Sequence, residues 1–179
     1  MTIEQETAQI LAPCLYVLNK LGKLSKHHIS KILYFADKFH IAKYGRSLTG
    51  QRYIAMKNGP VPSQIYDFIK FVEGRSDGSF LGAYTQYIGE FIGFIPSYFV
   101  FAKRSADIDF LSASAIKALD ESISIYGNSS FGLRTDESHD SAWKDAWERP
   151  GKNKDMSLIE IAISAGANSS MIDYIKASL

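Results

Sequence analysis

The sequence has a single cysteine, only two tryptophans and no long apolar run among its 179 residues. Because Cys14 is alone, the chain can form neither an internal disulfide nor a cysteine-cluster metal site, and its apolar setting "ILAPCLYVL" favours a buried, inert thiol. No stretch approaches the roughly 18 apolar residues of a membrane span. The N-terminus "MTIEQETAQI" lacks the basic and apolar regions of a secretory signal. We therefore expect a soluble, cytoplasmic protein with no membrane partner.

The sequence also lacks a strong charge of either sign, since 20 Lys and Arg residues against 19 Asp and Glu give a net charge of +1. This balance does not suggest a nucleic-acid-binding protein, although it is compatible with a local basic patch. The phosphate-binding patterns G-x-x-x-x-G-K-[ST] and G-x-G-x-x-G are both absent. We expect no bound cofactor.

What is present is an ordinary folding composition, 46% hydrophobic and 13% aromatic, at a length that suits one globular domain. Residues 4–21 show helical apolar spacing, although Pro13 would fit better if this helix began near Ala12. The clearest helix runs from an N-cap at Ser25 to a stop at Gly45. Its apolar arc is wide. We expect a solvated polar side opposite that arc, made by Ser30, Lys31, Tyr34 and Lys38.

The segment "MKNGPVPSQIYDF" (56–68) concentrates Gly59, Pro60 and Pro62 in one place. A short strand in "TGQRYIAMK" precedes it. The residues before the two prolines are pushed into extended conformations, and Pro62 can serve as the first residue of the following helix. The spacing therefore predicts a stiff turn from strand to helix, which we call the corner (57–62).

The remaining segments predict a hairpin and more helices. The aromatic runs "YTQYIGEFIGFIP" and "SYFVFAKR" (84–104) are typical of a hairpin with Pro96 and Ser97 between its arms. We expect a helix from Ser112 to Gly127, one helix over 135–150, and two short helices around 166–168. The predicted fold class is α+β and mostly helical, with helices packed around a small antiparallel β wing.

No set of residues indicates catalysis or metal binding. Asp37 and His40 lie one turn apart and could orient a base, but a half-buried histidine satisfied by the carboxylate is the simpler interpretation. His27 and His28 are adjacent in a helix, so their side chains point about 100° apart and do not readily share one ion. We assign no catalytic and no metal-binding residues.

Two features could bind a macromolecular partner. His139, Trp143 and Trp147 fall on one predicted helical face, where aromatic residues serve either as binding anchors or as core packing. The corner is rigid, and rigidity lowers the entropy cost of presenting a surface to a partner. Tyr53, Met56 and Tyr66 would flank that surface.

Three motifs in order resemble a known family. They are "KILYFAD" in the second helix, the "GPVP" turn before a helix with Tyr66, and the late "SHDSAW". Over about residues 5–150 the chain resembles the Panacea domain, a SocA-like antitoxin family whose members are often phage-associated proteins. On this basis residues 1–150 are the antitoxin domain and 151–179 a C-terminal helical extension packed on it. The aromatic hairpin of residues 84–104 looks more elaborate than the minimal domain.

The resemblance implies an antitoxin that neutralises a neighbouring-gene toxin by direct protein–protein binding and performs no catalysis. It also implies the toxin as partner and, in the SocA type, a protease to which the toxin is delivered. Operator DNA is an alternative partner for an autoregulator, because "LSKHHISKILYFADKFHIAKYG" resembles a helix-turn-helix, although the helix is very apolar for a DNA groove. A small hydrolase using His40 or His139 is a third hypothesis. The residues that we expect to bind the partner are Tyr34, Lys38, Tyr53, Met56, Lys57, Asn58, Gly59, Pro60, Tyr66 and Trp147.

Overall fold

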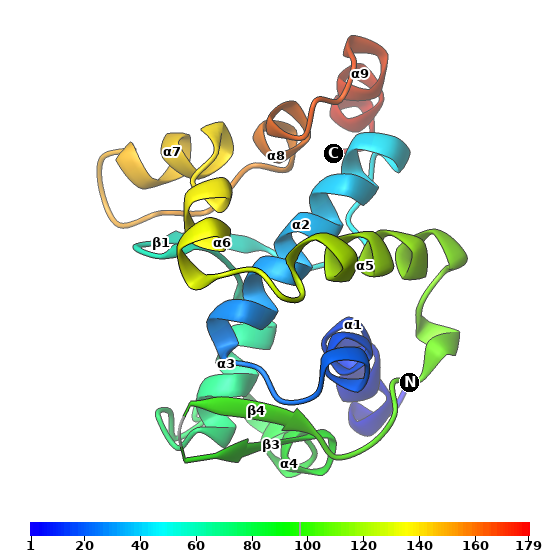
Figure 1. Ribbon diagram of the computed structural model, residues 1–179, viewed down its shortest axis with the longest axis vertical. Coiled ribbons are helices and arrows are strands. Elements are labelled where there is room, and N and C mark those ends of the chain that lie inside the picture. The colour runs from blue at the N-terminus through cyan, green and yellow to red at the C-terminus, as the bar shows by residue number, and fades with distance from the viewer. Residues whose placement is uncertain (97) are drawn as a thin grey trace.

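The structure, a computed structural model, describes residues 1–96 and 98–179 and is organised around one helix, α2 (Lys26–Tyr44). Figure 1 shows α2 running through the middle of the molecule, and other helices pack on several sides of it. Every residue of α2 from Ile29 to Asp37 is buried. Since successive side chains of a helix point about 100° apart, this stretch is covered on all sides. The helices in contact with α2 are α1 (Ile3–Leu21), α3 (Ser63–Val72), α5 (Ala113–Tyr126), α6 (Phe131–Ser138), α8 (Leu158–Ser164) and α9 (Ser169–Ser178).

The predicted solvated side of the second helix is therefore wrong. Ser30 and Lys31 are each 1% exposed, and Tyr34 is fully buried. Lys38 is half-buried. The sequence pattern identified the main apolar arc but not the elements that come from later in the chain to cover the opposite side.

Helix ends follow local signals in most places. The Ser25 hydroxyl oxygen accepts a hydrogen bond from the backbone N–H of His28, and Gly45 ends α2 in the left-handed region at φ 68°. α1 does not begin near Ala12, because Thr2 and Gln5 form a capping box and Pro13 lies inside the helix. Within the described residues, no helix combines the length and apolarity that crossing a membrane requires.

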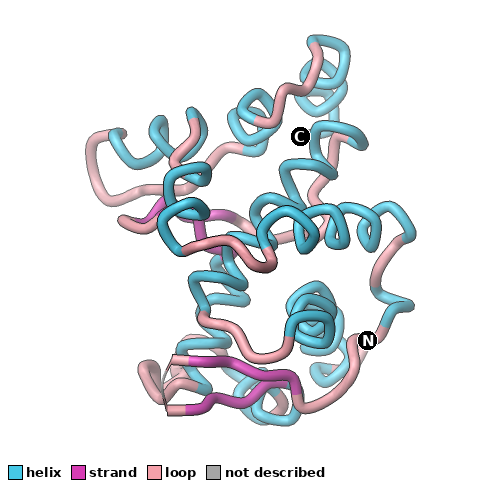
Figure 2. The backbone as a smooth tube through the Cα atoms, in the orientation of Figure 1, coloured by secondary structure: helices cyan, strands magenta, loops and turns pink. Residues whose placement is uncertain are grey.

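The described strands form two separate antiparallel hairpins, which confirms the mostly helical α+β class. β1 (Tyr53–Met56) pairs with β2 (Gly59–Pro62), and β3 (Ile92–Ile95) pairs with β4 (Phe99–Ala102). Figure 2 shows the two hairpins in different parts of the molecule. The predicted corner is thus corrected: residues 59–62 are the second strand of a tight hairpin, and α3 begins at the next residue.

The aromatic segment 84–104 is a hairpin only in its second half. A short 3₁₀-helix (Gly82–Gln86) and α4 (Ile88–Phe91) occupy most of the predicted first arm. The pairing runs from Ile92 opposite Ala102 to Ile95 opposite Phe99. Ser97 lies outside the described residues. A second 3₁₀-helix (Ile108–Phe110) leads into α5, which Ser112 caps as predicted.

The single helix predicted over 135–150 is two helices, α6 and α7 (Ser141–Glu148), with a break at His139 and Asp140. Asp140 is the N-cap of α7, and its side chain accepts a hydrogen bond from the backbone N–H of Trp143. The prediction of two short helices near the C-terminus is confirmed by α8 and α9. Residues 154–156 lie along β1. The backbone N–H of Ala55 donates to the Lys154 carbonyl oxygen, and the backbone N–H of Met156 donates to the Tyr53 carbonyl oxygen; both distances are 2.9 Å.

Candidate functional site

The three sequence motifs meet at the tip of the β1–β2 hairpin. Lys57 and Asn58 form its two-residue turn, since Met56 pairs with Gly59. Both turn residues are exposed, whereas Gly59 and Pro60 are buried. The "KILYFAD" helix passes beneath the tip, and the "SHDSAW" segment lies beside it. We call residues 56–60 the hairpin tip.

Lys31 supports the hairpin tip from below. Its ammonium group donates a hydrogen bond of 2.9 Å to the carbonyl oxygen of Pro60. Gly59 leaves the space for this approach, because a Cβ atom there would lie 2.6 Å from Cε of Lys31 and would collide with the Ser138 hydroxyl. The φ of Gly59, 101°, also disfavours any other residue. The glycine of "GPVP" is thus required by both backbone conformation and packing.

The positive charge of Lys31 is buried without a counter-ion among the described residues. Burial, aided by the nearby cation of Arg134, lowers the pKa of Lys31 to about 7. A buried lysine normally shifts in this direction because the uncharged amine is easier to desolvate. Lys31 is therefore only partly charged near neutral pH.

Two half-buried histidines flank the hairpin tip. Nε2 of His27 lies 3.0 Å from the Thr135 hydroxyl, and its ring stacks on Phe131. Burial, together with the charges of Lys31 and Arg134, lowers the pKa of His27 to about 3. Its buried Nδ1 lies near the backbone of Asn58 without full hydrogen-bond geometry.

His139 occupies the matching position on the other side of the turn. Its ring stacks on Trp143 at a centroid distance of 3.7 Å and lies near the backbone of Lys57, and its buried Nε2 has no hydrogen-bond partner among the described residues. Burial, followed by the charge of Lys31, lowers the pKa of His139. Both imidazoles are therefore neutral at pH 7.

Trp143 fixes the strand that leads into the turn. Its indole Nε1–H donates a hydrogen bond of 2.9 Å to the carbonyl oxygen of Met56. The ring is 8% exposed and stacks on Trp147, which is 39% exposed, at a centroid distance of 5.4 Å. Trp143 is therefore core packing, and Trp147 extends the same stack to the surface beside the hairpin tip.

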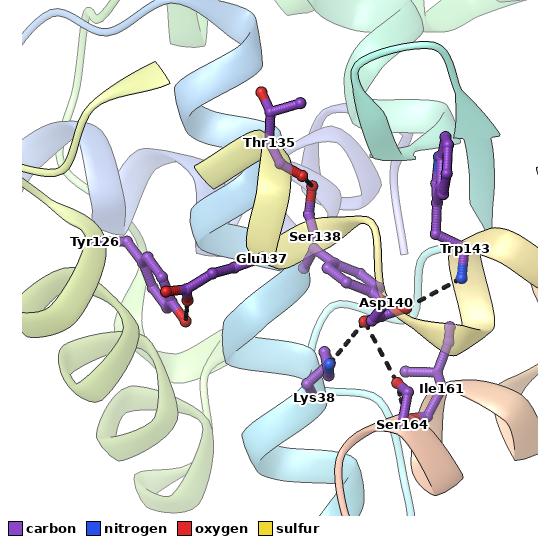
Figure 3. A network of polar contacts seen from close by, with 10 residues as sticks. Lys38, Tyr126, Thr135, Glu137, Ser138, Asp140, Trp143, Ile161 and Ser164 are labelled. Atoms are coloured by element: carbon purple, nitrogen blue, oxygen red, sulfur yellow. Dashed lines mark hydrogen bonds and ion pairs between the residues drawn. The ribbon is translucent and has the colours of Figure 1, made fainter. Parts of the chain in front are cut away.

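Asp140 ties the "SHDSAW" segment to α2 (Figure 3). Its Oδ2 accepts hydrogen bonds from the Lys38 ammonium group at 2.6 Å and from the Tyr34 hydroxyl at 2.8 Å. Its Oδ1 caps α7, as described above, and Ser164 of α8 approaches Oδ2 at 3.4 Å. One carboxylate thus connects α2, α7 and α8 around the base of the site.

A second buried carboxylate, Asp37, organises the approach to β1. It accepts hydrogen bonds from the Tyr53 hydroxyl at 2.8 Å and from the backbone N–H groups of Leu48 and Thr49. The expected pairing of Asp37 with His40 is wrong. Nδ1 of His40 lies 2.7 Å from the Arg46 carbonyl oxygen, and Nε2 lies 3.0 Å from the Ser114 hydroxyl.

The predicted partner-binding residues divide by exposure. Met56, Lys57, Asn58 and Trp147 are exposed, and Lys38 and Tyr66 are half-buried. The remaining four predicted residues are buried and do not lie on the exposed surface of the described residues; they are Tyr34, Tyr53, Gly59 and Pro60. Gly59 and Pro60 belong to the hairpin tip itself, whereas the hydroxyl groups of Tyr34 and Tyr53 donate to Asp140 and Asp37.

Sequence reasoning missed the two most informative residues. Lys31 belongs to "KILYFAD", but its place opposite the apolar arc predicts exposure, and no local feature of the sequence marks it as buried. Asp140 carried a usable signal, since an Asp one position before "SAW" fits an N-cap. His27 and His28 contact different partners: Nε2 of His28 lies 3.1 Å from the Tyr126 carbonyl oxygen, and Nε2 of His27 lies 3.0 Å from the Thr135 hydroxyl.

Comparison with known proteins confirms the family resemblance that the three motifs carry. The family model described as antitoxin SocA-like, Panacea domain, matches residues 29–144, a range that contains all three motifs. No curated protein and no solved structure matches the chain. Because the match covers more than half of the sequence, the chain belongs to the SocA-like antitoxin family that carries the Panacea domain.

Proposed function

We propose that this protein is an antitoxin that neutralises a neighbouring-gene toxin by binding it directly. The family supports the role. The observation that carries the site is the way the hairpin tip is held: Lys31 and Trp143 donate to the carbonyl oxygens of Pro60 and Met56 on either side of the turn. A turn anchored at both ends is already in its binding conformation, so docking costs little ordering entropy.

The exposed part of this site has the composition of a binding surface. Met56 and Trp147 are 38% and 39% exposed. Lys57 and Asn58, the two turn residues, are exposed as well. β1 packs against α7, and Trp147 stacks on Trp143, whose indole N–H donates to the Met56 carbonyl oxygen of the hairpin tip. Tryptophan is enriched among the residues whose truncation weakens interfaces most. We propose that these four residues contact the toxin.

A protein partner is favoured over operator DNA by the position of α2. A recognition helix must enter the major groove with exposed side chains. α2 is instead buried on all sides from Ile29 to Asp37. The hydrolase hypothesis also loses its first candidate, because both ring nitrogens of His40 are occupied by structural contacts.

The proposal is tested by expressing the neighbouring gene in a host cell with and without this chain. We expect growth arrest by that gene alone, relief on co-expression, and one co-eluting complex in size-exclusion chromatography. The matched variants are Trp147→Ala at the site and Tyr174→Ala on α9, where Tyr174 is also exposed. Arrest that co-expression does not relieve, or relief without a complex, would contradict neutralisation by direct binding.

A further inference from the structure

A hollow of about 160 Å³ opens beside the hairpin tip. Its walls come from the first turns of α2, from the β1–β2 hairpin and from Tyr66 of α3. Lys31 lies at its buried end, and the exposed Lys57 lies at its mouth. The hollow is separate from the Asp140 network, which none of its lining residues joins.

Charge in the hollow is unbalanced. Three lysines line it, and only Lys26 has a carboxylate partner, Glu73, at 2.6 Å. Among the described residues, no Asp or Glu oxygen lies within 4.0 Å of the ammonium groups of Lys31 or Lys57. The Lys31 ammonium group donates one of its three N–H groups to the Pro60 carbonyl oxygen, so two N–H groups remain available. A buried cation with unused donors is costly, and the lowered pKa of Lys31 reflects that cost; a bound anion would compensate the charge instead.

The walls indicate what kind of anion fits. Met56, Val61 and Tyr66 give the hollow apolar sides, so the ligand has a carbon stem and an acidic end. Phosphate groups are usually held by several donors at once, such as clustered backbone N–H groups, the fork of an arginine, or a lysine beside such groups. The lining contains no arginine, and its innermost donor is a single ammonium group. One carboxylate on an aliphatic stem matches this arrangement better than a phosphate.

We propose that the hollow receives an acidic side chain of the partner protein, with its carboxylate bound by Lys31 and Lys57. This inference rests on the proposed antitoxin function, because the acidic residue belongs to the toxin. The hairpin tip and the hollow then form one continuous docking surface, in which Met56 borders both. Insertion of a carboxylate also completes the charge pairing of Lys31 that the chain itself leaves open.

The first experiment tests the chemistry with a small probe. The chain is labelled with ¹³C-lysine and titrated with N-acetyl-glutamate α-amide, and with the neutral glutamine analogue, at about pH 6, below the Lys31 pKa of about 7. We expect a saturable shift of the Lys31 and Lys57 side-chain resonances with the acidic probe alone. In Lys31→Met the affinity for the acidic probe, followed through the Lys57 resonances, should fall by roughly tenfold or more. The control Lys176→Met, at an exposed position on α9, should bind the probe as the wild type does. Equal responses to both probes, or an unchanged response in Lys31→Met, would overturn the proposal.

The second experiment tests the source of the carboxylate. Affinity for the purified neighbouring-gene protein is measured for the wild type, Lys31→Met and Lys57→Met. We expect a loss of at least roughly 30-fold for Lys31→Met, which truncates a buried charge pair, and a smaller loss for Lys57→Met at the rim. Lys57 is exposed, so its variant tests the idea even if Lys31→Met folds poorly. Wild-type affinity in both variants would refute the carboxylate pocket while leaving antitoxin binding intact. Probe binding without any toxin complex would refute the toxin as the source and, with it, the proposed function.

Discussion

The ammonium group of Lys31 and the carbonyl oxygen of Pro60 lie 2.9 Å apart in the interior, and Lys31 is 1% exposed. This contact joins two family motifs that are separated by 29 positions in the sequence. It holds the hairpin tip at the cost of burying a charge. If Lys31 binds the partner as proposed above, stability and partner binding are linked through the same side chain.

Lys31 should give the wild type a stability that rises with pH. The unfolded side chain holds its proton up to its ordinary pKa of 10.5, whereas the folded one loses it near 7. Between these values the unfolded state binds more protons, so raising the pH favours folding. From pH 7 to 9 we expect the free energy of unfolding to rise by about 2 kcal/mol relative to Lys31→Met, measured by urea denaturation. Parallel profiles of the free energy of unfolding against pH for the two proteins would show that Lys31 is not desolvated. The control Lys176→Met should give the profile of the wild type.

Gly59→Ala should destabilise the protein by roughly 3 kcal/mol. The new Cβ would sit 2.6 Å from Cε of Lys31 and against the Ser138 hydroxyl, at a φ of 101°. Gly74→Ala is the matched control, since its φ is 71° and nothing lies within 4 Å of an added Cβ. The control should cost only about 1 kcal/mol. Equal losses in urea denaturation would mean that backbone conformation alone, and not the close approach of Lys31, requires the glycine.

The comparison of sequence and structure shows which kinds of signal are local. Ser25 and Gly45 bounded α2 correctly because capping depends on residues within one turn. The two prolines predicted extended backbone at the residues before them, and Val61 lies in β2 as predicted, whereas Gly59 has a φ of 101°, outside the extended region. They could not show that this segment pairs with β1, because a hairpin and a strand-to-helix turn impose the same local restrictions.

Burial of the polar side of α2 depends on distant parts of the chain. Lys31 is covered by the hairpin and by α6, and Tyr34 by Asp140, which is 106 positions away. A helical wheel contains no information about such partners. For the same reason, the sequence predicts Tyr34 and Tyr53 at the surface, whereas both are buried in the structure. Trp147, beyond the last buried turn of α7, is exposed as predicted.

Asp140→Asn should destabilise the protein by about 3 kcal/mol. The substitution removes the counter-ion of Lys38, whose side chain is only 13% exposed, and breaking a buried pair costs more than the pair itself contributes. The double variant Lys38→Met with Asp140→Asn should recover part of the loss, because no unpaired charge is left. Asp136→Asn, at an exposed position of α6, is the control for urea denaturation. Strictly additive effects would contradict a direct interaction between the two residues.

Trp147→Ala should weaken the proposed complex with the neighbouring-gene toxin by roughly 2 kcal/mol, or about 30-fold in Kd, while lowering the free energy of unfolding by only about 1 kcal/mol through loss of the stack on Trp143. The reason is its position: it is 39% exposed and stacks on the buried Trp143 beside the hairpin tip. Calorimetric titration measures the change, with Tyr174→Ala as the control on a distant exposed aromatic. If both variants bind as the wild type does, the docking surface lies elsewhere on the molecule.

Acid should destabilise the protein through the histidines around the hairpin tip. Burial lowers the pKa of His27 to about 3, and the pKa values of His28 and His139 also lie below their ordinary value. Between about pH 6.5 and 3 the unfolded state therefore binds more protons, and stability must fall as the pH falls through this window. In His27→Gln the fall should be shallower, because one of the groups that must be charged on unfolding is gone. Urea denaturation at pH 7 and pH 5 measures the difference. A steeper fall in His27→Gln would mean that His27 is protonated in the folded state, which would place a positive charge beside Lys31 and Arg134 and contradict the neutral ring described here.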